Sequence, residues 1–345
     1  MADRIFKYDK QQGTFMGWHS KTEVVETITW DTIWLKDWEL VAKVLWLDGK
    51  PTKYRILEMS DQPGIVIGNP YNSETFKPID NSAFLQLIKD SIAGTGHKIV
   101  SAGSVRNRGR VFVSVELAGM EKFKAAGREF SAYLNYGNGH DKTSVLWVNT
   151  SNTCTVCDNT FQMNLFTVEN KEKKLSEDGE ESVDLKISQR HTKNVLIKLP
   201  EIARLVDKAV GVQAEFALEM DKLSMQKVTK DEATELFAGF IGRKVTNKSL
   251  GLSTRSKNQV DRLVELFRNG KGNEGRNKAD MFQGVTDWYT HYSSGGEETI
   301  ARQFTTSEFG QGKTNKAEFW SLINNPMAYS ATIADGAELL AASKN

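Results

Sequence analysis

Apolar residues occupy every second position of residues 111–117, which is the spacing of a strand with one buried face. Residues 98–104 form a suitable partner strand, and the connection at residues 106–110 carries the asparagine and glycine that favour hairpins. The pattern therefore predicts a β-hairpin whose tip is crowded with arginines, namely Arg106, Arg108 and Arg110.

A second pair of strands is predicted directly after this hairpin. Residues 130–136 and 143–150 are the candidate strands, and Gly137-Asn138-Gly139 is a candidate turn between them. Asp158 or Asn159 could then cap a short helix over residues 160–166. The prediction for this part of the chain is two hairpins followed by a helix.

Four tryptophans precede these hairpins, Trp30, Trp34, Trp38 and Trp46, and the first three have a helical spacing of four residues. Trp30, Trp34 and Trp38 would form one stripe of a helix, although the β-branched residues around Trp30 also allow an extended chain. We favour these rings as core anchors over base-stacking platforms, because large aromatic side chains dominate burial. Short strands are predicted at residues 45–47, 53–59 and 64–68, and a helix at residues 82–92.

The second half of the chain is predicted to be mainly helical. The mixed charges of residues 169–189 predict a solvated loop. An amphipathic helix is predicted over residues 194–222, and Pro200 should either kink this helix or mark its start. Further helices are predicted at residues 230–239 with Thr229 as the cap, 254–268, 279–292 and 316–324, with a flexible break at residues 269–275.

These elements predict an α+β protein in which a twisted antiparallel sheet is followed by a helical C-terminal part. We place the α+β core within residues 1–220 and the mainly helical region within residues 221–345.

Composition narrows the class of protein. Hydrophobic residues make up 39% and charged residues 26% of the 345 residues, as in a soluble globular protein. No signal peptide and no apolar run long enough to span a membrane is visible, and the two cysteines do not form a disulfide framework. We therefore expect a cytoplasmic protein without a membrane partner.

The net charge of +1 provides no overall attraction to nucleic acid, so such binding would require a local basic patch. Residues 97–150 carry eight lysines and arginines and four acidic residues, a local balance of 8 − 4 = +4. In this region, basic side chains could hold phosphates, and aromatic side chains could either stack on bases or fill the core. The candidates are Lys98, Arg106, Arg108, Arg110 and Lys142 for phosphates, and Phe112, Tyr133, Tyr136 and Trp147 for bases.

Motifs for enzyme chemistry are weak. Cys154 and Cys157 lack a second cysteine pair for a structural zinc site, and no Walker sequence for ATP binding is present. A metal-dependent nuclease that uses His140, Asp141 and His191 is the main enzymatic alternative. We expect no cofactor.

Several segments resemble the phage/plasmid-like protein family, a domain of unknown function found in phages, prophages and plasmids. They are Trp18-His19, KYRILEMSD, GIVIGNPY, SAGSVRNRGRVFVSVEL, YLNYGNGHDKTSVLWVNTSNTCTVCDNTF and Arg190-His191-Thr192. The order of hairpin, further strands and helix is also similar to single-strand annealing proteins of the Red-beta, RecT and ERF type. Those proteins form rings or filaments and pair single strands of DNA without ATP.

The second resemblance implies a single-stranded DNA-binding and annealing protein of phage recombination, working as a homo-oligomer in a bacterial host cell. A single-strand-binding protein or another host protein is a candidate partner. Arg190 and His191 join the candidate nucleic-acid-binding residues because they belong to the resembling segments. A phage accessory protein that binds a host protein through its helical half is the remaining alternative.

Overall fold

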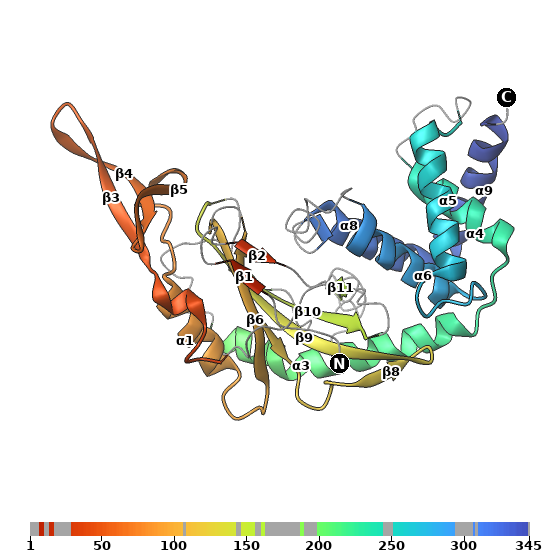
Figure 1. Cartoon of the computed structure of the whole chain (residues 1–345), viewed down its shortest axis with the longest axis horizontal. Helices are drawn as coiled ribbons and strands as arrows, with labels where there is room; N and C mark the ends of the chain where they lie inside the picture. Colours follow the sequence, from red (N-terminus) through yellow and green to blue (C-terminus); the bar gives the residue numbers. More distant parts are fainter. Residues whose placement is uncertain are drawn as a thin grey trace, which may run out of the picture. The chain divides into compact units, whose positions relative to one another are not determined.

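The computed structural model describes residues 7–9, 14–16, 29–105, 108–142, 146–155, 160–162, 187–189, 199–243, 251–293, 306–307 and 310–343. The chain is an α+β protein with antiparallel sheets and a largely helical C-terminal part (Figure 1), as the sequence predicts. None of the described helices combines the length and apolar composition needed to cross a membrane.

The chain divides into two compact units, which are described separately below. Unit 1 contains Met1–Lys122, Ser131–Asn152 and Met163–Gln213. Unit 2 contains Phe123–Phe130, Thr153–Gln162 and Ala214–Asn345.

The central sheet contains the predicted first hairpin. Strands β6 (Lys98–Val105) and β7 (Arg110–Glu116) pair antiparallel, which confirms that prediction. The strand order of this sheet is β11-β10-β9-β7-β6, in which the further strands are β9 (Arg128–Gly139), β10 (Leu146–Cys154) and β11 (Thr160–Gln162). Two short strands pair beside this path: β8 (Phe123–Ala125) pairs with β9, and β12 (Ile187–Gln189) pairs with β10. A small separate hairpin joins β1 (Lys7–Asp9) to β2 (Thr14–Met16).

Two predictions for the second hairpin are wrong. Gly137-Asn138-Gly139 is not a turn, because β9 continues through these residues and pairs with β7 as far as Gly139. Gly137 has another role: a Cβ there would lie 2.1 Å from the ring of Trp147, so only glycine leaves space for the indole. The helix predicted at residues 160–166 is also wrong where the structure describes it, since residues 160–162 form β11 beside β10.

The tryptophan stripe does not form the predicted helix. Only a single 3-10 turn, η1 (Trp34–Asp37), is helical there, and Trp38 is extended. Trp34 and Trp38 nevertheless stack, with ring centroids 5.8 Å apart, and both are buried. The predicted role as core anchors is therefore confirmed for these two rings, but it is wrong for Trp46, which is 65% exposed. The predicted helical geometry is not formed.

Three strands of unit 1 form a separate antiparallel sheet, β3-β4-β5, which we call the β-arm (residues 40–72). The strands β3 (Leu40–Leu47), β4 (Lys50–Met59) and β5 (Gln62–Asn72) are longer than predicted. Helix α1 (Asn81–Ser91) follows and confirms the prediction for residues 82–92. The Glu39 carboxylate accepts hydrogen bonds from the backbone N–H groups of Asn81 and Ser82, and so caps this helix.

Unit 2 is built mainly from helices, whose boundaries largely follow the capping signals. Thr229 accepts a hydrogen bond from the Glu232 N–H at the start of α4, and Ser253 accepts one from Ser256 at the start of α5. Pro200 lies at the second residue of α3, which confirms that it marks the start rather than a kink. The helices are α3 (Leu199–Ser224, which begins in unit 1), α4 (Lys230–Gly242), α5 (Thr254–Asn269), α6 (Lys278–Asp287), the π-helical η4 (Trp288–Tyr292), α8 (Gln311–Ile323) and α9 (Pro326–Ala342).

Helix α9 was not predicted, although Asn325 and Pro326 form a typical start: the Asn325 side chain accepts from two backbone N–H groups and Pro326 follows. It packs very closely on α4, because a Cβ at Gly336 would lie 1.8 Å from the carbonyl oxygen of Glu235. Aromatic side chains fill the core of this unit, among them Phe130, Phe216, Phe282 and Trp320 in one cluster and Phe237, Phe240, Phe267 and Phe319 in another.

Candidate nucleic-acid interface

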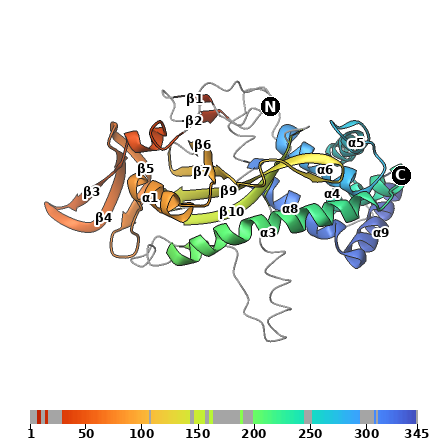
Figure 2. The same cartoon turned by 90° about the horizontal axis from the view of Figure 1, so that it is seen from below.

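The β-arm ends in a tight hairpin turn. Asp48 and Gly49 have φ angles of 50° and 73°, and two successive positive φ values are typical of the type I′ turn that suits twisted hairpins. Figures 1 and 2 show β3 and β4 running outward beyond α1, with this turn at their free end. The end of the arm therefore presents its side chains to solvent.

Exposed apolar side chains concentrate on this arm. Of the ten large hydrophobic residues that are exposed in the described part of the chain, six belong to the β-arm: Val41, Trp46, Leu47, Tyr54, Ile65 and Val66. Trp46 is 65% exposed, Leu47 67% and Tyr54 46%. Single exposed apolar residues are common on soluble proteins, but a cluster of them usually marks an interaction surface.

Lysines accompany the exposed aromatic rings. Lys50 and Lys53 are both exposed and lie between Trp46 and Tyr54 in the sequence. Lys53 makes only a loose ion pair with Glu74, at 3.7 Å between two exposed side chains. We call Trp46, Leu47, Lys50, Lys53 and Tyr54 the arm tip. Exposed aromatic rings together with exposed lysines are a combination that proteins use to bind single-stranded nucleic acids.

Arg108, predicted to hold phosphate at the hairpin tip, instead fixes the base of the β-arm. Its Nη1 donates to both carboxylate oxygens of Asp61 at 2.8 Å, and its guanidinium lies 4.8 and 5.4 Å from the ring centroids of Trp38 and Trp34. The Arg108 side chain is 4% exposed. The Arg108 guanidinium thus joins the β6–β7 hairpin to the β4–β5 turn. A phosphate would have to displace Asp61 to bind this guanidinium.

The other predicted phosphate ligands lie in different environments. Lys98 and Lys142 are exposed, and the Lys142 ammonium donates to the carbonyl oxygen of Pro70. Arg110 is half-buried, with its Nε 3.9 Å from the Asp141 carboxylate. Arg106, Arg190 and His191 lie outside the described residues.

The predicted base-stacking aromatics line the sheet interior, which was the alternative role for them. Phe112, Tyr133 and Tyr136 are buried, and Trp147 is half-buried over Gly137. The Tyr136 hydroxyl is 2.9 Å from Ser91 Oγ, and burial raises the pKa of this phenol well above its usual range.

Buried polar side chains on the sheet form a chain of hydrogen bonds. Ser114 Oγ donates to Asn135 Oδ1 at 2.6 Å, and Asn135 Nδ2 donates to Ser151 Oγ at 2.7 Å and to Asn149 Oδ1 at 3.3 Å. All four residues are buried. The chain of bonds crosses β7, β9 and β10 and stabilises their register.

Of the residues predicted for the nuclease alternative, His140 is buried and hydrogen-bonded within the fold. The buried His140 ring uses both nitrogens: Nδ1 donates to the Arg108 carbonyl at 3.1 Å, and Nε2 accepts from Asn138 at 3.1 Å. This pattern requires a neutral ring. Within the described ranges, no group of three or more His, Cys, Asp or Glu side chains is placed to hold a metal ion.

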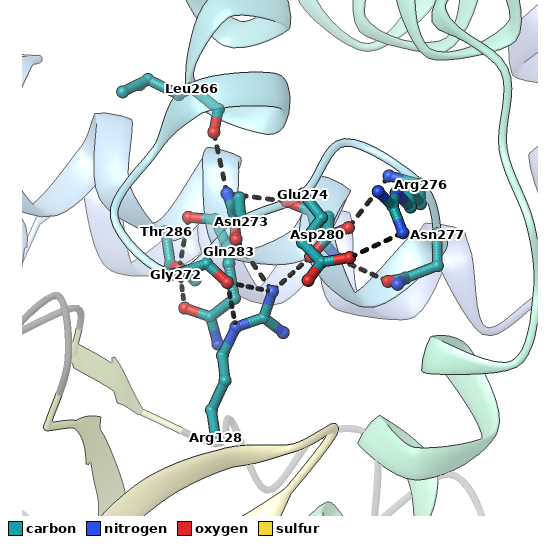
Figure 3. Close-up of polar contacts among 10 residues, drawn as sticks. All are labelled: Arg128, Leu266, Gly272, Asn273, Glu274, Arg276, Asn277, Asp280, Gln283 and Thr286. Atoms are coloured by element: carbon teal, nitrogen blue, oxygen red, sulfur yellow. Dashed lines mark hydrogen bonds and ion pairs between the residues drawn. The ribbon is translucent and has the colours of Figure 1, made fainter.

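Unit 2 contains a buried ion pair that holds a loop predicted to be flexible (Figure 3). The Arg128 guanidinium donates to the Gly272 carbonyl oxygen at 2.9 and 3.0 Å, to Asn273 Oδ1 at 3.1 Å and to the buried Asp280 carboxylate. Asp280 also accepts from the Arg276 N–H at 3.0 Å. The predicted break between two helices is confirmed, because α5 ends at Asn269 and α6 begins at Lys278, and these bonds join the loop between them to β9.

A second buried carboxylate lies where α6 passes into η4. The Ser293 N–H bonds to the Trp288 carbonyl oxygen five residues earlier, which is the π-helical pattern often found near functional sites. Burial raises the pKa of Asp287 to about 6, partly offset by the charges of Arg262 and Lys271, and its Oδ1 lies 3.9 Å from His291 Nε2. Nothing in the sequence distinguishes this aspartate from the exposed ones.

A family model described as a domain of unknown function (DUF932) matches residues 71–318, which is most of the chain. The chain belongs to the DUF932 family. Most of the β-arm precedes the matched residues of this DUF932 protein, whereas Arg108, Arg128 and Asp287 lie within them. No curated protein and no solved structure matches the chain.

The raised pKa of Asp287 predicts how the stability of this DUF932 protein depends on pH. An ordinary carboxyl titrates near 3.9, so the folded state binds this proton more tightly than the unfolded state does. The free energy of unfolding contributed by this group is highest below pH 4 and falls as the pH rises through about 6. Asp287→Asn should therefore stabilise the protein at pH 7.5, and the gain should shrink by about 2 kcal/mol at pH 4.5.

Urea unfolding of the two proteins at both pH values measures this change. Asp261→Asn is the matched control, because Asp261 is an exposed carboxylate on the neighbouring helix α5. An equal difference between wild type and Asp287→Asn at both pH values would show that Asp287 is ionised in the folded state throughout.

Proposed function

We propose that this DUF932 protein binds single-stranded DNA through the arm tip and brings complementary strands together without ATP. The observation that supports this proposal is the exposure of Trp46 and Tyr54 beside Lys50 and Lys53 at the free end of the β-arm. Stacking of one base on an aromatic ring contributes about 1–3 kcal/mol, independent of its sequence. Phosphate contacts add affinity that weakens with salt.

The chemistry of annealing makes modest demands on such a protein. The protein must hold one strand with its base edges accessible and reduce the repulsion between the two phosphate backbones. Rings that stack on a base face leave its pairing edge open, and lysines lower the phosphate repulsion. No proton transfer and no metal-bound nucleophile is required.

The setting we propose is homologous recombination of a phage or plasmid in a bacterial host. The resemblance of the chain to phage and plasmid proteins and to annealing proteins of the Red-beta, RecT and ERF type supports it. The predicted residues Lys98, Arg110 and Lys142 remain candidates for further phosphate contacts.

Removing the aromatic rings of the arm tip should weaken DNA binding without unfolding the protein. Trp46→Ala and Tyr54→Ala each should raise the Kd for a labelled oligothymidylate by about 5- to 150-fold, the equivalent of one stacked base. Fluorescence anisotropy of the full chain at two salt concentrations measures the Kd. Leu218→Ala is the matched control, since Leu218 is similarly exposed on α3.

The lysines are tested by salt dependence rather than by affinity alone. Lys50→Gln with Lys53→Gln should lower the slope of log K against log salt by about 1.4, or 0.7 for each lost contact. Lys89→Gln on α1 should leave the slope unchanged. Binding equal to that of the wild type in both the aromatic and the lysine variants would refute the arm tip as the interface. If the variants bind more weakly, a strand-pairing assay in EDTA separates annealing from binding alone.

A further inference from the structure

Strand β3 is an uncovered edge of the β-arm sheet. The strand order is β3-β4-β5, so one side of β3 has no strand partner among the described residues. Its eight residues, Leu40–Leu47, are half-buried or exposed, and Lys43 is their only charge. A bare apolar edge of this kind is a template for a further strand.

The opposite edge is protected, which singles out β3. Strand β5 contains Pro63 and Pro70, which cannot donate backbone hydrogen bonds, and Gly64 and Gly68 with φ angles of 91° and 63°. Such residues commonly guard sheet edges against unwanted pairing. Strand β3 has neither proline nor glycine.

The irregularity of the arm does not interrupt the outer edge of β3. Between the pairs Val44↔Arg55 and Trp46↔Pro51, β3 contributes the single residue Leu45 while β4 contributes residues 52–54. The extra residues are thus in β4, and none is inserted in β3. An edge strand of eight residues is long enough to form an antiparallel ladder.

We propose that β3 pairs antiparallel with β3 of a second copy of this chain, which joins the two arms into one six-stranded sheet. A two-fold axis near the middle of β3 would place each strand opposite its own sequence. The charge of Lys43 does not oppose this pairing, because its Nζ is bound to Glu58 on the adjacent strand at 2.6 Å. That lysine and the Gly64 N–H hold the pKa of Glu58 below its usual range, so the Glu58 carboxylate stays charged at neutral pH.

The consequence for DNA binding follows from the geometry of such a sheet. With the two-fold axis perpendicular to the sheet, equivalent faces of both arms lie on the same side. Equivalent residues of the two arm tips then lie on the same side of the joined sheet, where both could contact one DNA strand. This consequence for DNA binding rests on the proposed function. The pairing itself stands on the strand edge and is measured without DNA.

Sedimentation velocity of the full chain without DNA tests the pairing, and a dimer is expected. Ala42→Lys adds one lysine to each β3, on the opposite face from Lys43, and the two-fold axis brings both added charges to the same face of the joined sheet. The substitution should weaken the dimer by at least 10-fold, because like charges on paired strands repel. Ala42 is exposed, so the thermal melt of the separated chains should not change. Ser82→Lys on α1 is the control for added charge and should leave the dimer intact.

Cysteine cross-linking locates the interface. Single cysteines at positions 42, 43 and 44, introduced by Ala42→Cys, Lys43→Cys and Val44→Cys in a Cys157→Ser background, should give disulfide-linked dimers at the position nearest the axis. Cys154 is buried and should not interfere. A monomer at all concentrations, or a dimer that neither Ala42→Lys weakens nor these cysteines link, would overturn the proposal, even if single-stranded DNA still binds.

Discussion

Replacement of Asp61 by alanine should lower the free energy of unfolding by about 3 kcal/mol, because it leaves the Arg108 guanidinium buried without its carboxylate. The Arg108 side chain is 4% exposed and Asp61 is 35% exposed, so water reaches the acid more easily than the base. Removing the base should therefore cost less: Arg108→Met leaves a partly solvated carboxylate and keeps an apolar contact with Trp34 and Trp38.

Urea unfolding measures the two free energies, and hydrogen exchange of residues 34–39 and 57–61 shows whether the loss is at the base of the β-arm. Asp90→Ala is the control, since this carboxylate is exposed and accepts a bond from Gln86 on the same helix. A larger loss in the free energy of unfolding for Arg108→Met than for Asp61→Ala would contradict the claim that a buried, unpaired guanidinium is the main cost.

Breaking the Arg128–Asp280 pair in unit 2 should cost still more, about 3–5 kcal/mol. Both side chains are buried, and the Arg128 guanidinium is also bound to Gly272 and Asn273 (Figure 3). Asp280→Ala would leave that charge without a carboxylate, and would also remove the acceptor of the Arg276 N–H. The loop at residues 269–275 should then exchange its backbone hydrogens faster.

The same loop provides the matched control. Arg276 and Glu274 form an ion pair at 3.1 Å, but their side chains are 76% and 67% exposed. Exposed pairs contribute at most about 1 kcal/mol. Glu274→Ala should therefore change the urea midpoint little, and equal losses for Glu274→Ala and Asp280→Ala would contradict the role of burial.

These stability effects decide which variants are useful for testing DNA binding. A combined substitution of Arg106, Arg108 and Arg110 would remove the anchor of the β-arm along with any phosphate contact. Loss of binding in that protein could not be assigned to either cause. The exposed residues of the arm tip avoid this problem, because their side chains contribute little to the core.

Local patterns predicted the elements that depend on near neighbours. The alternation of residues 111–117 gave β7, and the caps Thr229 and Ser253 mark the starts of α4 and α5. The prediction failed at residues 160–162, where the edge of β10 provides a strand partner that a helix cap cannot reveal. Pairing with a distant strand overrides a weak local preference.

The candidate site was harder to predict, because burial is set by the tertiary structure. Trp34, Trp38 and Trp46 are the same residue type within one segment, yet only Trp46 is exposed. Arg108 finds its partner 47 residues away, so its role as an anchor has no local signal. The sequence does contain a pattern that could have predicted the arm tip: aromatic residues and lysines flank an Asp-Gly turn, namely Trp46, Lys50, Lys53 and Tyr54.

Ultraviolet cross-linking of the full chain to oligothymidylate, followed by mass spectrometry of the peptides, tests the central claim most directly. The arm tip should carry the adducts, at Trp46 and Tyr54, and their yield should fall at high salt. Adducts confined to other parts of the chain, such as the peptides containing Phe112 or Trp147, or no adducts at low salt, would contradict DNA binding by the β-arm.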